Sequence, residues 1–238
     1  MPVYRLPDTG VRFPDPSAAE ADGLLAVGGD LSAKRLVAAY SLGIFPWYSE
    51  GCPLLWWSPD PRCILLPEEF HLPRSLKRVL KSGLFSFSLD RAFPEVIKAC
   101  AGPRANATDT WLTPEMIAAY INLHRLGFAH SVETWRGGVL VGGLYGVALG
   151  RVFFGESMFR IEPDASKAAL VRLISELEAR NFTLLDCQQV TGHMLRFGAR
   201  PVPRKEFMRL LSNGLAGRRE DGWSGSRRYA RTSSIGTP

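Results

Sequence analysis

The chain has 238 residues, of which 46% are hydrophobic and 22% are charged, so it can bury a core and is neither disordered nor of low complexity. Its formal net charge is +6. The four cysteines, Cys52, Cys63, Cys100 and Cys187, show no CxxC spacing and no histidine cluster. These features predict no disulfide framework, no metal site and no bound cofactor.

The uncharged stretches of the sequence are too short to cross a membrane. The longest lies between Arg136 and Arg151, where 14 residues stand against the roughly 20 that a membrane helix needs. The first residues also lack the charged and apolar regions of a secretory signal. We therefore expect a cytoplasmic protein that makes no membrane contact, and we expect it to be a monomer.

The first 60 residues are rich in glycine, proline and aromatic residues, and they contain one predicted helix. Ser32 is its N-cap and Gly43 ends it. Further on, Pro59 and Pro61 interrupt regular structure, and an apolar strand pattern begins at Cys63. These signals predict a domain boundary near residue 62.

The boundary gives three predicted segments. A small N-terminal domain covers residues 1–62, and a larger second domain covers residues 63–212. Residues 213–238 hold five arginines, one Glu and one Asp, which is half of the net charge, and they show no periodicity. We expect this tail to be mobile; its charge serves either solubility or contact with a polyanion such as RNA.

A short helix predicted over residues 73–83 carries a stripe of cations. Arg74, Lys77, Arg78 and Lys81 fall at i, i+3, i+4 and i+7, so they share one helical face. Such a stripe is usually the solvated side of an amphipathic helix. No acidic residue is interleaved with it, which favours phosphate binding as the alternative.

The remaining predicted elements alternate between helices and strands. Thr113 caps a helix that stops at Gly127, and glycine pairs then separate β-rich runs as in hairpins. Asp164 is the predicted cap of the longest helix. A strand over residues 182–188 and a helix over residues 204–211 follow. This order predicts an α+β fold, a mixed sheet with helices on its faces.

Two strands carry polar groups where a purely structural strand would not place them. Glu156 interrupts an apolar run, and a period of two places it on the same face as Met158. The same rule aligns Asp186 with Gln188, a carboxylate beside a carboxamide that could handle a proton. The alternative is structural, with Asp186 bonding to the next turn and Gln188 satisfied at an edge.

Eight segments between residue 13 and about residue 210 form a distinctive combination of motifs. They are Gly23–Leu31, Gly43–Trp47, Trp56–Arg62, Trp111–Thr113, Gly142–Ala148, Phe154–Phe159, Ala165–Lys167 and Leu185–Gln188. In this order and at this spacing, the motifs resemble those of the bacterial leucyl/phenylalanyl-tRNA–protein transferases. Arg160 departs from the pattern, because the family usually has a small serine there, and the tail has no counterpart in it.

The resemblance implies a small N-terminal domain joined to an acetyltransferase-like (GNAT) domain that works without acetyl-CoA. It also implies the reaction, in which leucine or phenylalanine, and less readily methionine, moves from its tRNA to a protein that begins with Arg or Lys. That transfer marks the acceptor protein for degradation. The partners are therefore aminoacyl-tRNA and such acceptor proteins.

Site residues follow from the resemblance and from physical fit. Asp186 and Gln188 would relay a proton, and Glu156 would hold the cationic N-terminus of the acceptor. Trp47 and Trp111 would stack on the terminal adenosine, although packing between the domains explains Trp47 about as well. The apolar residues expected to form the aminoacyl pocket are Leu144, Phe153, Met158, Leu170, Leu177 and Leu185.

Two other functions compete with this interpretation. A CoA-dependent N-acetyltransferase of the same fold would need a glycine-rich loop before a helix, whereas residues 160–164 hold two acids and a proline. A non-catalytic tRNA-binding module could use the cation stripe and the tail. The presence of Asp186, Gln188 and Glu156 argues against it.

Overall fold

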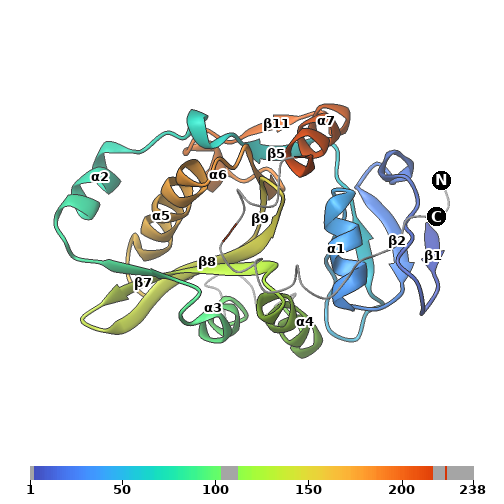
Figure 1. The fold of residues 1–238 in the computed structure, drawn as a ribbon, viewed down its shortest axis with the longest axis horizontal. Helices are drawn as coiled ribbons and strands as arrows, with labels where there is room; N and C mark the ends of the chain where they lie inside the picture. The colour runs from blue at the N-terminus through green and yellow to red at the C-terminus, as the bar shows by residue number, and fades with distance from the viewer. Residues whose placement is uncertain (1–2, 103–111, 217–222, 224–238) are drawn as a thin grey trace.

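A computed structural model describes residues 3–102, 112–216 and Trp223 (Figure 1). Four short strands form an N-terminal sheet in the order β1-β2-β4-β3. Helix α1 (Ala33–Ser41) starts as predicted, because the Ser32 side chain accepts a hydrogen bond from the backbone N–H of Arg35. The strands are β1 (Tyr4–Leu6), β2 (Leu24–Gly28), β3 (Phe45–Pro46) and β4 (Leu55–Trp57).

The larger sheet has seven strands in the order β11-β5-β10-β9-β8-β7-β6. Its one parallel pair is β9 with β10, and the other neighbours are antiparallel. The strands are β5 (Arg62–Leu65), β6 (Ser86–Leu89), β7 (Ala129–Arg136), β8 (Val139–Leu149), β9 (Val152–Arg160), β10 (Leu184–Gln188) and β11 (Arg200–Val202). This arrangement confirms the predicted α+β class and its mixed, helix-flanked sheet.

Helices cover both faces of the large sheet. Helices α1, α3 and α4 pack on one face and α5 on the other. A Cβ atom on Gly142 would lie 2.6 Å from the Cβ of Ala165, so a glycine in β8 allows α5 to approach the sheet closely. After α1, the helices of the described residues are α2 (Arg74–Lys81), α3 (Phe93–Cys100), α4 (Pro114–Arg125), α5 (Ala165–Ala179), α6 (Gly192–Leu195) and α7 (Arg204–Leu215). Two short 3₁₀ helices cover Pro16–Ala18 and Pro67–Glu69.

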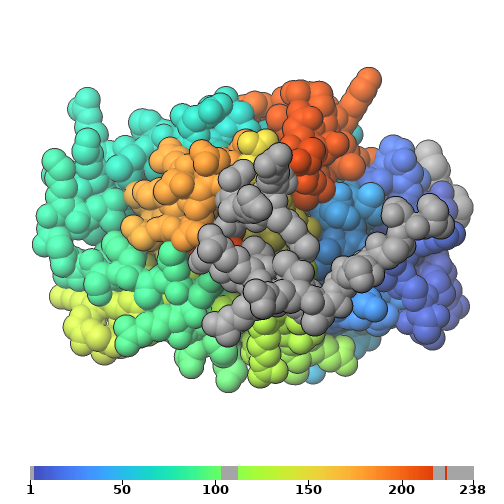
Figure 2. Space-filling model, in the orientation of Figure 1, coloured from blue at the N-terminus to red at the C-terminus, as the bar shows by residue number. Residues whose placement is uncertain are grey.

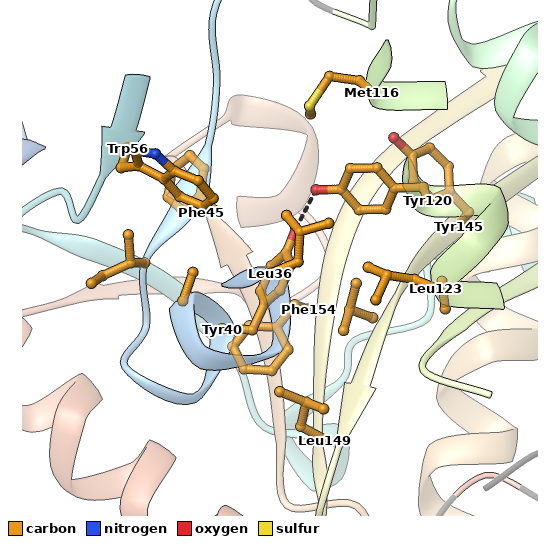
Figure 3. Close-up of a cluster of buried hydrophobic side chains, with 14 of the residues drawn as sticks. Leu36, Tyr40, Phe45, Trp56, Met116, Tyr120, Leu123, Tyr145, Leu149 and Phe154 are labelled. Atoms are coloured by element: carbon orange, nitrogen blue, oxygen red, sulfur yellow. Dashed lines mark hydrogen bonds between the residues drawn. The ribbon is translucent and has the colours of Figure 1, made fainter. Parts of the chain in front are cut away.

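One hydrophobic core joins the two sheets. Leu36 and Tyr40 of α1 belong to the same buried cluster as Tyr120 of α4 and Phe154 of β9 (Figure 3). The strands divide between Trp57 and Arg62, close to the expected domain boundary. The shared core ties the N-terminal sheet to the rest of the molecule. Division of the chain into separate domains near residue 62 therefore stays a prediction.

Three local predictions need correction. Asp164 does not cap α5 with its side chain; it adopts a left-handed φ of 65°, and its carboxylate accepts a hydrogen bond of 2.6 Å from Lys167 Nζ. Helix α7 continues to Leu215, four residues further than predicted, so the tail does not begin at residue 213. Trp223, which was expected to be mobile with the tail, is only 3% exposed.

The molecule is elongated, with the N-terminal sheet at one end and α2 at the other (Figure 1). In Figure 2 the residues of α2 project from the left end of the molecule. Leu76 anchors α2 to the core, and its four cationic residues are exposed. Within the described ranges no helix is long and apolar enough to cross a membrane.

Candidate active site

A cleft of about 1090 Å³ opens where β9 and β10 separate. The two strands pair only from Leu184 to Asp186 on β10 and from Val152 to Phe154 on β9. Beyond this ladder β9 remains paired with β8, so the ends of β9 and β10 diverge and their side chains line the cleft together with α5. Glu156 and most of the apolar residues of the sequence prediction line the cleft.

Glu156 is the extra residue of a β-bulge. Gly155 pairs with Gly146 and Ser157 pairs with Tyr145, which leaves Glu156 without a partner on β8. The bulge changes which side chains share a face. Met158 packs with the core beneath α5, whereas Glu156 points to the α1 and α4 side, so the prediction that the two share a face is wrong.

Three donors hold the Glu156 carboxylate. Its Oε1 accepts hydrogen bonds from Tyr40 Oη at 2.8 Å and from Gln188 Nε2 at 2.7 Å, and its Oε2 accepts one from Tyr120 Oη at 3.0 Å. Tyr40 comes from α1 and Tyr120 from α4, and their hydroxyls also contact each other, as the dashed line in Figure 3 shows. Both tyrosines are fully buried.

The surroundings of Glu156 bring the pKa of its carboxyl group close to neutral pH. Burial raises the pKa of Glu156 to about 7; the hydrogen bonds from Tyr40 and Tyr120 oppose this rise, and the charge of Asp186 adds to it. Burial, and then the charge of Glu156, raise the pKa of each tyrosine well above its ordinary value. Around neutral pH the tyrosines therefore remain donors while Glu156 can exchange a proton.

Asp186 is paired with Arg62 rather than with a side chain in the cleft. Both residues are buried, with 2.8 Å from Arg62 Nε to Oδ1 and 2.7 Å from Nη2 to Oδ2 of the carboxylate. The guanidinium lies over the rings of Phe45 and Phe207, at 4.8 and 4.5 Å from their centroids. This bidentate pair fixes β5 against β10 at the point where the cleft begins.

Gln188 depends on Asp186 through its backbone. The backbone N–H of Gln188 donates a hydrogen bond of 2.9 Å to Asp186 Oδ1, and Gln188 has a left-handed φ of 62°. The register of β10 shifts between these two residues, so alternation along the strand does not align their side chains as predicted. The carboxamide turns to Glu156 instead.

Most of the expected apolar pocket lines the cleft. Leu144, Phe153, Met158, Leu170 and Leu185 all do so, and Leu173 and Met194 join them. Leu177 does not; it is fully buried between α5 and the sheet, which corrects its assignment to the pocket.

Charged and polar groups also reach the cleft wall. Arg160 is an exposed residue of this wall, at the position where it departs from the family pattern. His193 lies there too, and burial followed by the charges of Lys167, Arg196 and Arg160 lowers its pKa. No group of three or more His, Cys, Asp or Glu side chains is placed to hold a metal ion within the described part of the chain.

Trp47 and the four α2 cations, which were expected to contact nucleic acid, lie at the surface. Trp47 is 39% exposed and its ring packs at a tilt against Trp57, with 5.7 Å between centroids. Trp111 lies outside the described residues. In α2 the side chains of Arg74, Lys77, Arg78 and Lys81 are exposed, and none of the four forms an ion pair within the described ranges.

Sequence reasoning missed three residues of this site. The three are Tyr40, Tyr120 and Arg62, and no role was predicted for any of them from the sequence. Arg62 and Asp186 are 124 positions apart, and Tyr40 and Glu156 are 116 apart. The available signal was that a lone strand carboxylate such as Glu156 needs buried donors elsewhere in the chain.

Comparisons with known proteins agree over most of the length. A family model described as leucyl/phenylalanyl-tRNA protein transferase matches residues 64–212, and a model of the N-terminal domain of that family matches residues 29–60. Proteins named leucyl/phenylalanyl-tRNA–protein transferase from Anaeromyxobacter sp. (strain Fw109-5) and Syntrophobacter fumaroxidans are each 56% identical to this chain over 216 residues. Each alignment covers 90% of this chain and 92% of the relative.

Similarity to solved structures is more distant. A GCN5-related N-acetyltransferase from Kribbella flavida has a TM-score of 0.36 and 12% identity, and the match covers 69% of this chain and 59% of that one. A TM-score this low carries no weight, and the fold rests on the strand order given above.

Proposed function

The chain belongs to the leucyl/phenylalanyl-tRNA–protein transferase family, and we propose that it moves leucine or phenylalanine, and less readily methionine, from tRNA to proteins that begin with Arg or Lys. The observation that carries this proposal is the cleft itself. Its apolar wall lies beside a carboxylate with a pKa of about 7, which is what an aminoacyl ester and an attacking amine require.

The reaction needs positioning and one proton transfer. The α-amine nitrogen of the acceptor bonds to the ester carbonyl carbon, and the bond from that carbon to the ribose oxygen of the tRNA breaks. The amine, with a pKa of about 7.7–8.0, loses a proton as the new bond forms, and the leaving ribose oxygen gains one. The products are a lengthened protein and a free tRNA end.

In this proposal Glu156 accepts the proton from the amine and returns it to the ribose oxygen. Before the reaction, its carboxylate attracts the ammonium form of the acceptor N-terminus, which releases one proton to solvent and becomes the neutral amine that attacks. Gln188, Tyr40 and Tyr120 hold the carboxylate, since all three donate to it. Asp186 contributes by fixing the backbone of Gln188. The proton relay that we expected from Asp186 and Gln188 is thereby reassigned to Glu156.

The donor occupies the apolar part of the cleft. Leu144, Phe153, Met158, Leu170 and Leu185 form a wall of flexible and rigid apolar groups that suits leucine and phenylalanine alike. Trp47 and Trp111 would stack on the terminal adenosine. The four α2 cations would contact tRNA phosphates, because their charge is exposed and carries no partner within the described part of the chain. We place this activity in the cytoplasm, in a monomer, as the step that marks an acceptor protein for degradation.

One assay tests both substrates. The full chain is incubated with radiolabelled leucyl- or phenylalanyl-tRNA and with peptides that differ only at the first residue, Arg, Lys or Glu, and with an Arg peptide whose α-amine is acetylated. We expect label only on the free Arg and Lys peptides. Label on the Glu peptide would overturn the acceptor preference. Binding of tRNA without transfer, or acetylation from acetyl-CoA instead, would overturn the proposed reaction.

A further inference from the structure

Trp223 belongs to the buried cluster that lies between α5 and the large sheet. It is 3% exposed, and its indole Nε1 donates a hydrogen bond of 2.8 Å to Asp90 Oδ2. Its ring stacks on His130 at 4.7 Å between centroids, and the Arg180 guanidinium lies 5.2 Å from its centroid. Trp223 is therefore a component of the core rather than part of a solvated tail.

Hydrogen bonds fix the polar groups that surround the Trp223 indole. Asp90 has a left-handed φ of 59°, and its Oδ1 accepts a hydrogen bond of 2.9 Å from the Ser131 backbone N–H. Its Oδ2 accepts from Trp223, and it lies 2.8 Å from His130 Nδ1. His130 is almost fully buried. Removal of the indole would leave these polar groups beside an empty space.

Phe153 connects this position to the cleft. Its ring lies 5.7 Å from that of Trp223, and the residue also lines the cleft. From the β8 side Gly146 holds the Phe153 ring, since a Cβ atom on Gly146 would lie 2.4 Å from Phe153 Cε1. The ring is thus confined by the β8 backbone and by Trp223. If the indole were absent, Phe153 could move away from the cleft.

We propose that Trp223 is a positioning residue that sets the depth of the aminoacyl cleft by holding Phe153 in place. The inference rests on the proposed function, because it assumes that the cleft takes the side chain of the transferred amino acid. It assigns a role to a residue beyond position 212, where the family match ends. A deeper cleft would favour the larger donor, so loss of the indole should raise kcat/KM for phenylalanine relative to leucine.

The test uses leucyl-adenosine and phenylalanyl-adenosine as donors, so that tRNA contacts cannot contribute. Trp223→Ala should raise the phenylalanine to leucine ratio of kcat/KM about tenfold, the size that small changes in an apolar pocket produce. Trp223→Phe keeps a ring against Phe153 and should restore the ratio. Trp135→Ala is the matched control, because it removes an indole from β7 at a residue that does not line the cleft.

Each result decides the matter. If folded Trp223→Ala keeps the wild-type ratio, or slows both donors equally, Trp223 has only a structural role and the inference is wrong. If Trp223→Ala does not fold, Trp223→Phe and Trp223→Leu replace it, and a ratio that ignores side-chain size overturns the inference. Met158→Ala separates the two proposals: a ratio unchanged there as well would show that the cleft is not the aminoacyl site.

Discussion

The acid–base role proposed for Glu156 makes a specific prediction for the pH dependence of transfer. In wild type both the acceptor amine and Glu156 must be deprotonated. With pKa values of about 7 for Glu156 and about 7.8 for the amine, kcat/KM should rise roughly 400-fold from pH 6 to pH 8. In Glu156→Gln only the amine titrates, and the rise should fall to roughly 40-fold. The variant should also be about 10² to 10⁴ times slower at pH 8.

A second variant tests the cause of the pKa. The hydrogen bond from Tyr120 lowers the pKa of Glu156, so Tyr120→Phe should move the lower kinetic pKa above 7 without abolishing it. His193→Gln is the control, since His193 also lines the cleft and titrates. That variant should leave the lower step of the profile where it is. A step that disappears in His193→Gln and persists in Glu156→Gln would refute the assignment.

Ionisation of Glu156 should also affect stability. As the pH rises, kcat/KM should increase, whereas the contribution of Glu156 to the free energy of unfolding should decrease. The pKa of Glu156 is higher in the folded state than in the unfolded chain, so between about pH 4.5 and 7 the folded state binds more protons. The free energy of unfolding should therefore decrease across this window by at most about 3 kcal/mol because of this group. Urea denaturation of wild type and Glu156→Gln at pH 4.5 and pH 8 measures the difference, and parallel curves would contradict it.

Three further predictions concern the ion pair, the pocket and the tRNA contact. Asp186→Asn leaves the Arg62 charge buried without its partner and should lower the free energy of unfolding by about 3–5 kcal/mol. The double variant Arg62→Met/Asp186→Leu should recover stability but not transfer activity. Recovery of transfer in the double variant would show that Asp186 does not belong to the site. Met158→Ala enlarges the pocket and should lower the leucine to phenylalanine ratio of kcat/KM about tenfold. Leu177→Ala leaves the cleft lining intact and should lower stability alone, so equal ratios in the two variants would contradict the pocket. Each single alanine substitution of the four α2 cations should reduce the slope of log binding constant against log salt concentration for tRNA by about 0.7–0.9. The rate of transfer from aminoacyl-adenosine donors should not change. Equal losses of activity with tRNA and with adenosine donors would refute a phosphate contact.

Local signals predicted most helices well. Ser32 and Thr113 each cap a helix as expected, because capping depends on residues only three positions apart. The pair Gly137-Gly138 between β7 and β8, and Gly150 between β8 and β9, likewise marked the hairpins. These elements are determined by short stretches of sequence, and for that reason a single sequence can reveal them.

The faces of β9 and β10 could not be predicted in the same way. Alternation holds only while each residue keeps a partner, and bulges at Glu156 and next to Gln188 break it. A bulge depends on the geometry of the neighbouring strand, which the sequence of one strand does not contain. The same limit hid Trp223, whose polar partner Asp90 lies 133 positions away.

The N-terminal sheet and its helix shape the surroundings of Glu156 and Arg62 as well as the fold. Tyr40 of α1 both donates to Glu156 and helps to exclude water from it, and Phe45 of β3 covers the guanidinium of Arg62. Burial is the largest cause of the raised pKa of Glu156. If α1 moved away from β9, water would reach the carboxylate and its pKa would fall toward 4.5, which makes it a weaker base. The reactivity of a residue in the large sheet therefore depends on the packing of the small one.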